Sequence, residues 1–380
     1  MFDSSAFERL RAIGLTPALM QQLALLPPPG ETSALVAEPA HRAHGDWSLG
    51  RPGELMRITE VQREGLSLHD GSGPHSARLL PALRSLLADN GDAVAVGDWV
   101  IAQRNPLGEW WVHERVPPLN QLARRLHDGR DKVARAVIVS NIDTALLVMG
   151  LDHDFNLRRL ERYVTLARLA GVGAVVVLTK KDLAPDAEQR LRSVQALLPA
   201  DVTAVAVDAL GAEPRQALSP WVQTGQTLVL LGSSGAGKST LTNSLTCTDL
   251  QDTGPSRSGD GRGRHTTTVR SLHTTPQGAC IIDTPGLRTL RLDGDADAVG
   301  AAFDDISTLA QACRFRDCRH ADEPGCAVRG GVGDERLRNF HKLLREARRD
   351  TLSALERRTQ LQQWKSRARN ARVRIAAKRG

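Results

Sequence analysis

The segment Gly232–Thr240, with the sequence Gly-Ser-Ser-Gly-Ala-Gly-Lys-Ser-Thr, constrains the fold of this 380-residue chain more than any other. It fits the pattern Gly-x-x-x-x-Gly-Lys-Ser/Thr, follows the apolar run Thr227–Leu231 and precedes residues with helical spacing. There the glycines let the backbone wrap a phosphate at a helix N-terminus, with its N–H groups pointing inward. We expect Lys238 to lie against the β- and γ-phosphates, as a candidate catalytic residue, and the Ser239 hydroxyl to bind Mg²⁺. The candidate phosphate-binding residues are Gly232, Ser233, Ser234, Gly235, Ala236, Gly237, Lys238, Ser239 and Thr240.

Strand-like and helical patterns alternate around this motif, from about Ala134 to Ile282. Short, continuously apolar runs predict strands, and Asn156–Ala170 has the apolar spacing of a helix. Because strands that are apolar throughout are buried on both faces, the pattern predicts an α/β domain with a parallel sheet. The predicted strands are Ala145–Met149, Ala174–Leu178, Val202–Val207, Thr227–Leu231 and Ala279–Ile282.

An acidic residue follows the last of these strands, in the segment Asp283-Thr284-Pro285-Gly286. Beside a phosphate-binding loop, a carboxylate at this end of a strand can hold Mg²⁺ through water, and a glycine N–H shortly after it can contact the γ-phosphate. Asp283 and Gly286 are therefore candidate nucleotide-binding residues, with Asp283 and Ser239 as candidate magnesium ligands. The alternative is a plain strand-to-turn ending.

The segment Thr179-Lys180-Lys181-Asp182 follows the strand Ala174–Leu178 and resembles the Asn-Lys-x-Asp motif with which GTPases bind guanine. In that motif the carboxylate accepts hydrogen bonds from guanine N1–H and the N2 amino group, a pair of donors that adenine lacks. The lysine stem packs on the base. Thr179 stands where asparagine is usual, which predicts a weaker or altered supporting contact. Thr179, Lys180 and Asp182 are the candidate guanine-binding residues.

The order of the two motifs is reversed relative to an ordinary GTPase, because Asp182 precedes Lys238. The sheet can still form, since ligand-binding loops lie at the carboxyl edge of the strands whichever connection is cut. The chain therefore looks like a circularly permuted P-loop GTPase domain, which we place at residues 126–292.

Two different regions precede this domain. Residues 1–45 contain one amphipathic helical stretch, Phe7–Leu26, that stops at a Pro-Pro-Pro-Gly run. Residues 46–125 have short mixed runs broken by glycine, proline, asparagine and aspartate, as in a small antiparallel β-barrel. Arginines and tryptophans there could form a nucleic-acid face, although tryptophan in a small barrel is more often core. The strands are expected within Glu54–Val61, Ala93–Gln103 and Glu109–Val116, and the face would use Trp99, Arg104, Trp110, Trp111 and Arg115.

Three of the five cysteines lie together with a histidine near the end of the chain. Three thiolates and one imidazole suit tetrahedral Zn²⁺, and a site filled by four protein ligands would be structural. The candidate ligands are Cys313, Cys318, His320 and Cys326, in a predicted helical domain at residues 293–380. Cys247 and Cys280 are expected to be small core residues. Five cysteines in a chain of this length do not form a disulfide framework. A reducing compartment, the cytoplasm, is therefore the favoured location.

The formal charge of +7 is concentrated at one end of the chain. Residues 339–380 contain 13 Lys/Arg and 3 Asp/Glu, so the remainder carries a net −3. This distribution favours a polyanionic partner, nucleic acid rather than a membrane. A solvated, salt-bridged helix is the alternative. No apolar run approaches the length of a membrane span.

Four features together resemble the bacterial ribosome small subunit-dependent GTPase A family (RsgA, also called YjeQ) over roughly residues 50–345. They are the permuted motif order, the run Arg262–Thr268, the segment Asp283–Leu287 and the cysteine–histidine spacing Cys313–Cys326. The resemblance implies an N-terminal OB-fold, a permuted GTPase domain and a C-terminal α-helical zinc-binding domain. It further implies GTP/GDP, Mg²⁺ and one structural Zn²⁺ as cofactors, and the 30S ribosomal subunit with its 16S rRNA as partner. Such a GTPase would hydrolyse GTP when docked and assist late small-subunit maturation; we expect a monomer.

The resemblance also implies roles for residues around the nucleotide. Thr267 lies where a GTPase has its first switch, and would bind Mg²⁺ and the γ-phosphate. Leu287 replaces the usual water-orienting glutamine, so His265 becomes the candidate for that catalytic role, with a phosphate or RNA contact as alternatives. Asp208 and Ala209 match the loop that contacts guanine, with Asp208 in place of serine.

Two other functions fit parts of the sequence. A P-loop ATPase or kinase acting on a small molecule would explain Gly232–Thr240 but not Thr179–Asp182 or the cysteine cluster. An RNA-binding module with GTP as a structural ligand would leave Lys238, Ser239 and Asp283 without a purpose. Relative affinity for ATP and GTP separates the first from a GTPase.

Overall fold

The computed structural model describes residues 4–26, 53–127, 133–248, 270–284 and 296–351. They form two compact units, residues 1–123 with 136–290 and residues 124–135 with 291–380, which we describe separately. His265, Thr267, Gly286 and Leu287 lie outside the described residues. The finer division at residues 45, 125 and 292 remains a prediction.

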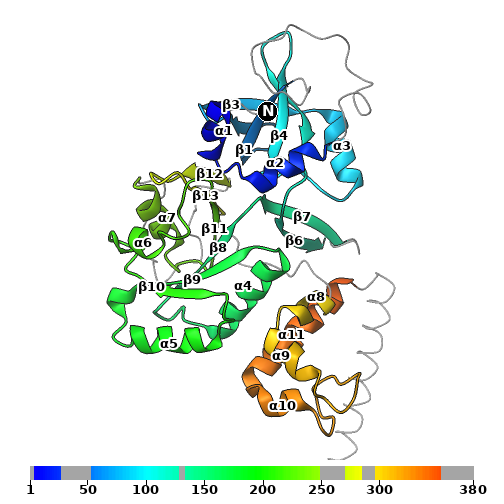
Figure 1. The fold of residues 1–380 in the computed structure, drawn as a ribbon, viewed down its shortest axis with the longest axis vertical. Coiled ribbons are helices and arrows are strands. Elements are labelled where there is room, and N and C mark those ends of the chain that lie inside the picture. Colours follow the sequence, from blue (N-terminus) through cyan, green and yellow to red (C-terminus); the bar gives the residue numbers. More distant parts are fainter. Residues whose placement is uncertain (1–3, 27–52, 128–132, 249–269, 285–295, 352–380) are drawn as a thin grey trace, which may run out of the picture. The chain divides into compact units, whose positions relative to one another are not determined.

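A five-stranded barrel begins the first unit (Figure 1). β1 pairs with β2 and with β4, and β3 pairs with β2 and in parallel with β5, which returns to β4. The ring is therefore closed, as in an OB-fold, and confirms the predicted barrel. Its interior is filled by side chains such as Met56, Ile58, Leu68 and Val112. The elements are β1 Glu54–Val61, β2 Leu66–His69, β3 Pro74–Leu79, α3 Pro81–Asp89, β4 Trp99–Arg104 and β5 Trp110–Arg115.

The amphipathic N-terminal stretch is helical, as predicted, and forms two helices, α1 (Ser4–Arg11) and α2 (Pro17–Ala24). The break has a local cause: Gly14 has a φ of +92°, and Pro17 begins α2 behind the capping hydroxyl of Thr16. The apolar faces of both helices pack on the barrel, where they cover Leu55, Trp99, Ile101 and Val116.

Trp99 is fully buried in this contact and Trp110 is nearly so. The predicted nucleic-acid face is therefore wrong in including Trp99, because the Trp99 ring belongs to the core. The core is also the more common place for tryptophan in a small barrel. Trp111 is half-buried, with the guanidinium of Arg78 5.8 Å from its ring centre.

The nucleotide sheet has the strand order β10-β9-β8-β11-β13-β12. The first five strands are parallel and β12 is antiparallel, so the predicted parallel α/β domain is confirmed. β12 also pairs with β1 of the barrel at Glu60 and Ser271, which makes one continuous eleven-stranded sheet. The strands are β8 Thr144–Gly150, β9 Gly173–Thr179, β10 Thr203–Ala206, β11 Thr227–Leu231, β12 Ser271–Thr274 and β13 Cys280–Asp283. The helices are α4 Leu157–Leu169, the 3-10 turn η1 Lys181–Leu183, α5 Ala187–Leu197, α6 Glu213–Ala217 and α7 Lys238–Thr246.

Four helices make up the described core of the second unit. Phe303 and Phe340 meet edge to face, with ring centres 5.1 Å apart, and Arg336 pairs with Asp305 at 2.6 Å. The helices are α8 Ala296–Ala301, α9 Asp304–Ala310, α10 Ala327–Gly331 and α11 Asp334–Thr351. Separately, β6 Gln121–His127 and β7 Val133–Ser140 pair as a two-stranded sheet.

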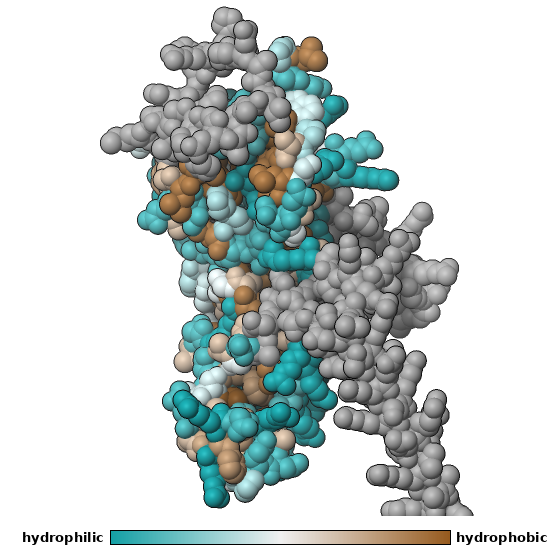
Figure 2. All heavy atoms as spheres, turned by 90° about the vertical axis from the view of Figure 1, so that its right-hand side faces the viewer, coloured by the Kyte–Doolittle hydropathy of each residue, from teal (hydrophilic) through white to brown (hydrophobic). Residues whose placement is uncertain are grey.

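The surface view in Figure 2 is mainly hydrophilic, with apolar residues in separate patches. Among the described helices, none combines the length and the apolar composition needed to cross a bilayer.

Candidate functional site

The phosphate-binding loop joins β11 to α7, as predicted. Gly232 lies so close to β8 that a Cβ there would come within 2.3 Å of the Val148 carbonyl oxygen, and Gly237 has a φ of +88° just before α7. Both positions therefore require glycine. The Lys238 ammonium folds over the loop and donates to the carbonyl oxygens of Gly232 (3.0 Å) and Ser233 (2.6 Å). A cation and a helix N-terminus thus converge where a phosphate would bind.

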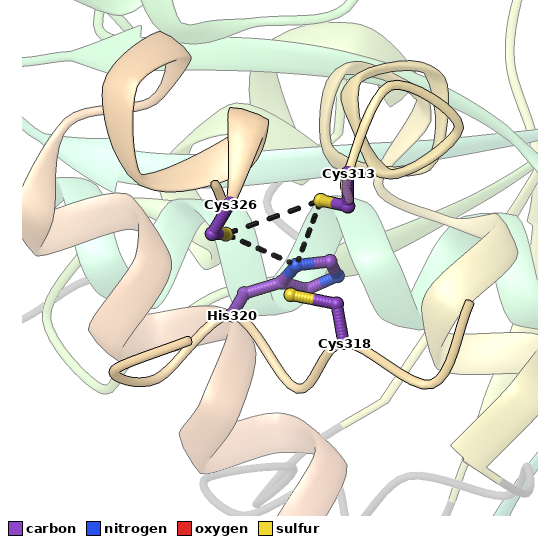
Figure 3. A group of neighbouring side chains, drawn as sticks. All are labelled: Cys313, Cys318, His320 and Cys326. Atoms are coloured by element: carbon purple, nitrogen blue, oxygen red, sulfur yellow. Dashed lines mark hydrogen bonds between the residues drawn. The ribbon is translucent and has the colours of Figure 1, made fainter. Parts of the chain in front are cut away.

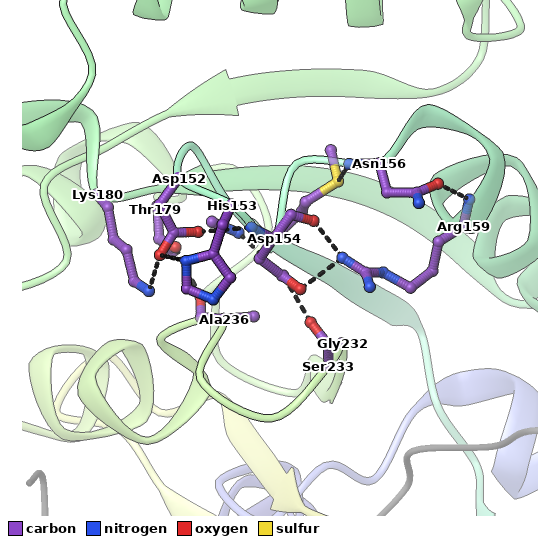
Figure 4. Close-up of polar contacts among 12 residues, drawn as sticks. Asp152, His153, Asp154, Asn156, Arg159, Thr179, Lys180, Gly232, Ser233 and Ala236 are labelled. Carbon is purple, nitrogen blue, oxygen red and sulfur yellow. Dashed lines mark hydrogen bonds and ion pairs between the residues drawn. The ribbon is translucent and has the colours of Figure 1, made fainter. Parts of the chain in front are cut away.

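The guanine motif lies beside this loop, although it precedes it in the chain. Thr179 is fully buried at the end of β9, and its hydroxyl donates to the Ala236 carbonyl oxygen at 2.6 Å (Figure 4). The threonine at this position therefore ties the motif to the loop. Lys180 has a left-handed backbone (φ +59°), and Asp182 is exposed.

A glutamate that the sequence did not single out links the guanine motif to the Asp208–Ala209 loop. Glu213, in the first turn of α6, accepts from the Lys181 ammonium at 2.7 Å and from the Asp208 N–H at 2.9 Å. The Asp208 carboxylate accepts from the Leu210 N–H at 2.9 Å, and Ala209 is buried. The loop after β10 is thus held against the segment that follows β9.

The two candidate magnesium ligands within the described residues, Ser239 and Asp283, lie after β11 and at the end of β13. These strands are parallel neighbours, so Asp283, 7% exposed at the end of β13, shares the sheet edge with the phosphate loop. The Thr284 hydroxyl donates to the Leu230 carbonyl oxygen at 3.1 Å and holds the chain leaving β13 against β11. Ser239 is half-buried in the first turn of α7.

Two more carboxylates missing from the sequence prediction lie in the turn between β8 and α4. Asp152 pairs with Lys180 and Asp154 accepts from Ser233, so the turn contacts both nucleotide motifs (Figure 4). A sequence signal was available, since polar residues directly after a buried parallel strand face the ligand edge of the sheet.

The four predicted zinc ligands come together in the second unit (Figure 3). The Sγ atoms of Cys313 and Cys326 are 4.0 Å apart, and the His320 Nδ1 lies 3.7 Å and 3.5 Å from them. All four ligand atoms, including that of Cys318, lie within 4.8 Å of one another. Tetrahedral Zn²⁺ with bonds of about 2.3 Å to sulfur and 2.0 Å to nitrogen requires separations of about 3.5–3.8 Å. The cluster therefore fits a closed zinc site.

Comparisons with known proteins agree with this geometry. Residues 116–293 match the RsgA GTPase family. The small ribosomal subunit biogenesis GTPase RsgA 2 of Vibrio vulnificus is 43% identical over 315 residues, which cover 82% of this chain and 86% of that protein. The corresponding RsgA of Xylella fastidiosa strain M23 is 43% identical over 303 residues, covering 78% of this chain and 88% of its own.

Two crystal structures share the fold. YjeQ from Thermotoga maritima has a TM-score of 0.58 at 21% identity, over 77% of this chain and 98% of its own. YloQ, described as a circularly permuted GTPase, has a TM-score of 0.55 at 24% identity, over 83% of this chain and 99% of its own. The alternative of an ATPase or small-molecule kinase is not supported. With the motif order, the sheet and the relatives in agreement, the chain belongs to the RsgA GTPase family and is a circularly permuted GTP hydrolase.

Proposed function

We propose that this GTPase binds the 30S ribosomal subunit through contacts with 16S rRNA, hydrolyses GTP while docked, and assists late maturation of the subunit. The observation that carries the nucleotide part is the bond from Thr179 to the Ala236 carbonyl oxygen, which places the guanine motif against the phosphate loop. The ribosomal part rests on relatives such as the Vibrio vulnificus protein, which is named for small-subunit biogenesis.

Each candidate residue has a role in this proposal. Asp182 accepts from the guanine edge, the Lys180 stem supports the base, and the loop Gly232–Thr240 with Lys238 holds the phosphates. Ser239, Thr267 and Asp283 hold Mg²⁺ directly or through water, and the Gly286 N–H contacts the γ-phosphate. His265 accepts a proton from the attacking water, because Leu287 cannot orient it.

The zinc unit has a surface suited to an RNA backbone. Four exposed arginines surround the cysteine cluster, and one of them lies over the exposed ring of Phe315, 5.6 Å from its centre. Guanidinium groups bind phosphates and an aromatic ring can stack on an unpaired base. These arginines are Arg314, Arg316, Arg319 and Arg329.

We propose that the protein acts as a monomer in the cytoplasm.

The test is the GTPase rate with purified 30S subunits, with 50S subunits as control. We expect stimulation by 30S alone, and a His265→Ala variant that binds GTP normally but shows no stimulated turnover. Equal rates with and without 30S would contradict the docking proposal. Full stimulated turnover in His265→Ala would remove the role of that residue only.

A further inference from the structure

The turn between β8 and α4 has a particular place in the sheet. β8 pairs with β9 on one side, where Gly150 lies opposite Thr179, and with β11 on the other, where Leu147 lies opposite Leu231. The chain that leaves β8 therefore emerges between the guanine motif, which ends β9, and the phosphate loop, which ends β11. Two carboxylates of this turn make contacts there, one with each motif.

Asp154 holds the phosphate-loop side. One of its carboxylate oxygens accepts from the Ser233 hydroxyl at 2.6 Å and lies 3.5 Å from the Gly150 N–H, and the other pairs with the Arg159 guanidinium at 2.5 Å. Only 11% of the Asp154 side chain is exposed. Asn156 caps α4 by accepting from the Arg159 N–H at 3.0 Å, which fixes the helix turn from which that guanidinium reaches back.

Asp152 holds the guanine-motif side. One oxygen of its carboxylate pairs with the Lys180 ammonium at 2.7 Å, and the other accepts from the Asp154 backbone N–H at 3.0 Å, so the Asp152 side chain is held against the backbone of the turn at Asp154. Partial burial opposes ionisation of Asp152, but the bonds from Lys180 and from the Asp154 N–H bring its pKa below the usual value. A Cβ on Gly150 would come within 2.7 Å of the Asp152 Oδ1, so the glycine leaves room for this pair.

Carboxylates beside a nucleotide site repel the phosphates unless a cation compensates them. Here each is compensated, Asp154 by Arg159 and Asp152 by Lys180, and each directs a bond to a nucleotide motif. We propose that Asp152 and Asp154 are positioning residues: Asp154 orients the phosphate loop through Ser233, and Asp152 orients the Lys180 stem for the base. This inference rests on the proposed nucleotide site.

The two carboxylates then have separable effects on ligands. Loss of Asp154 disturbs the contacts of the phosphates, so it weakens GDP but leaves guanosine, which has no phosphate, unchanged. Loss of Asp152 disturbs support of the base, so it weakens GDP and guanosine by the same factor. A change that merely destabilises the fold does not separate the two ligands in this way.

The test is titration of the full-length protein with a fluorescent GDP analogue, with guanosine as competitor. We expect Asp154→Ala to raise the dissociation constant of GDP about tenfold, the effect of one hydrogen bond to a charged group, with guanosine unchanged. We expect Asp152→Ala to weaken both ligands about tenfold. Ser233→Ala combined with Asp154→Ala should be no worse than either change alone, because both remove the same bond.

Asp201→Ala is the matched control. Asp201 also pairs with an arginine at 2.5 Å, Arg168, but it precedes β10 at the opposite edge of the sheet, and we expect its GDP affinity to equal that of the wild type. The inference is overturned if Asp154→Ala weakens guanosine as much as GDP, if the effects of Ser233→Ala and Asp154→Ala add, or if both turn variants behave like Asp201→Ala. A wild-type protein that binds no GDP would instead overturn the proposed nucleotide site.

Discussion

Arg57 is a fully buried cation at the point where the N-terminal helices, the barrel and the nucleotide sheet meet. Its guanidinium donates to the carbonyl oxygens of Ile13 at 2.5 Å, Asn141 at 3.2 Å and Gly97 at 3.4 Å. It also lies 5.6 Å from the centre of the Trp99 ring. Desolvation lowers the pKa of Arg57, although nearby Cys280 and Asp143 oppose this shift.

Arg57→Met keeps most of the volume but removes all three donors. The Gly97 carbonyl oxygen keeps the Asn141 side-chain amide as a donor at 3.0 Å, but the carbonyl oxygens of Ile13 and Asn141 lose the Arg57 donor, at about 1–3 kcal/mol for each one left without a partner. Asp143 also loses a compensating charge. Removal of one partner from a buried ionic group typically costs about 3–5 kcal/mol in total, so we expect a loss of about 4 kcal/mol. Gly14→Ala should act on the same contact, because a Cβ there would lie 1.9 Å from the Arg57 Nη1 at a backbone φ of +92°.

Urea unfolding followed by tryptophan emission measures this effect, since Trp99 lies beside the guanidinium. With a slope of about 2 kcal/mol per molar urea, the midpoint of Arg57→Met should fall by about 2 M. Arg78→Met is the control: its guanidinium also lies beside a tryptophan ring, but the side chain is 61% exposed, and we expect a change below about 0.5 kcal/mol. An Arg57→Met midpoint as high as that of Arg78→Met would refute the reasoning.

Three further predictions concern zinc, guanine and pH. The purified protein should contain one zinc per chain by elemental analysis. Cys318→Ser should lower both the zinc content and the melting temperature, because the metal stabilises the folded state. An active protein without zinc would contradict the site. Asp182→Asn should reduce the preference for GTP over ATP at least about tenfold in competition binding, while an unchanged preference would assign guanine recognition to other groups. Burial raises the pKa of Asp98 to about 6, against the opposing effects of Arg115 and the Ala95 N–H. The folded state then holds a proton that the unfolded state releases, so stability should fall as the pH rises from about 4 to 6, and Asp98→Asn should flatten this part of the profile; an equally steep variant would assign it to another group.

Local patterns predicted the nucleotide sheet well. The strand Thr227–Leu231 has the predicted bounds, because a continuous apolar run before a glycine-rich loop has few other conformations. Features that depend on neighbours far along the chain were predicted less well. The burial of Trp99 follows from α1 and α2 packing over the barrel, and Phe7–Leu26 gave no indication of that location.

Cys247 shows a second limit of local patterns. It was expected to be a core residue within a helix, but α7 ends at Thr246, and Cys247 is exposed with a φ of +55° and accepts from Arg215 at 2.6 Å. The prediction for Cys280 is confirmed, because it lies in the buried strand β13. A helix end shifted by one residue is within the uncertainty of sequence patterns, and here it decides whether a side chain is buried.

Some site residues escaped sequence analysis because they act through contacts between segments that are far apart in the chain. A motif such as Gly232–Thr240 works through its own backbone, so its spacing survives wherever the chain is cut. Asp154 and Glu213 instead act across strands: Asp154 contacts Ser233, 79 positions later, and Glu213 contacts Lys181, 32 positions earlier. Polar residues directly after β8 mark the ligand edge of the sheet, but bonds of this kind have no characteristic spacing, so the partners become visible only when the sheet places the ends of β8, β9, β10 and β11 side by side. These carboxylates thereby hold loops that are distant in sequence against one another at the ligand edge of the sheet, which the connectivity of the chain alone does not do.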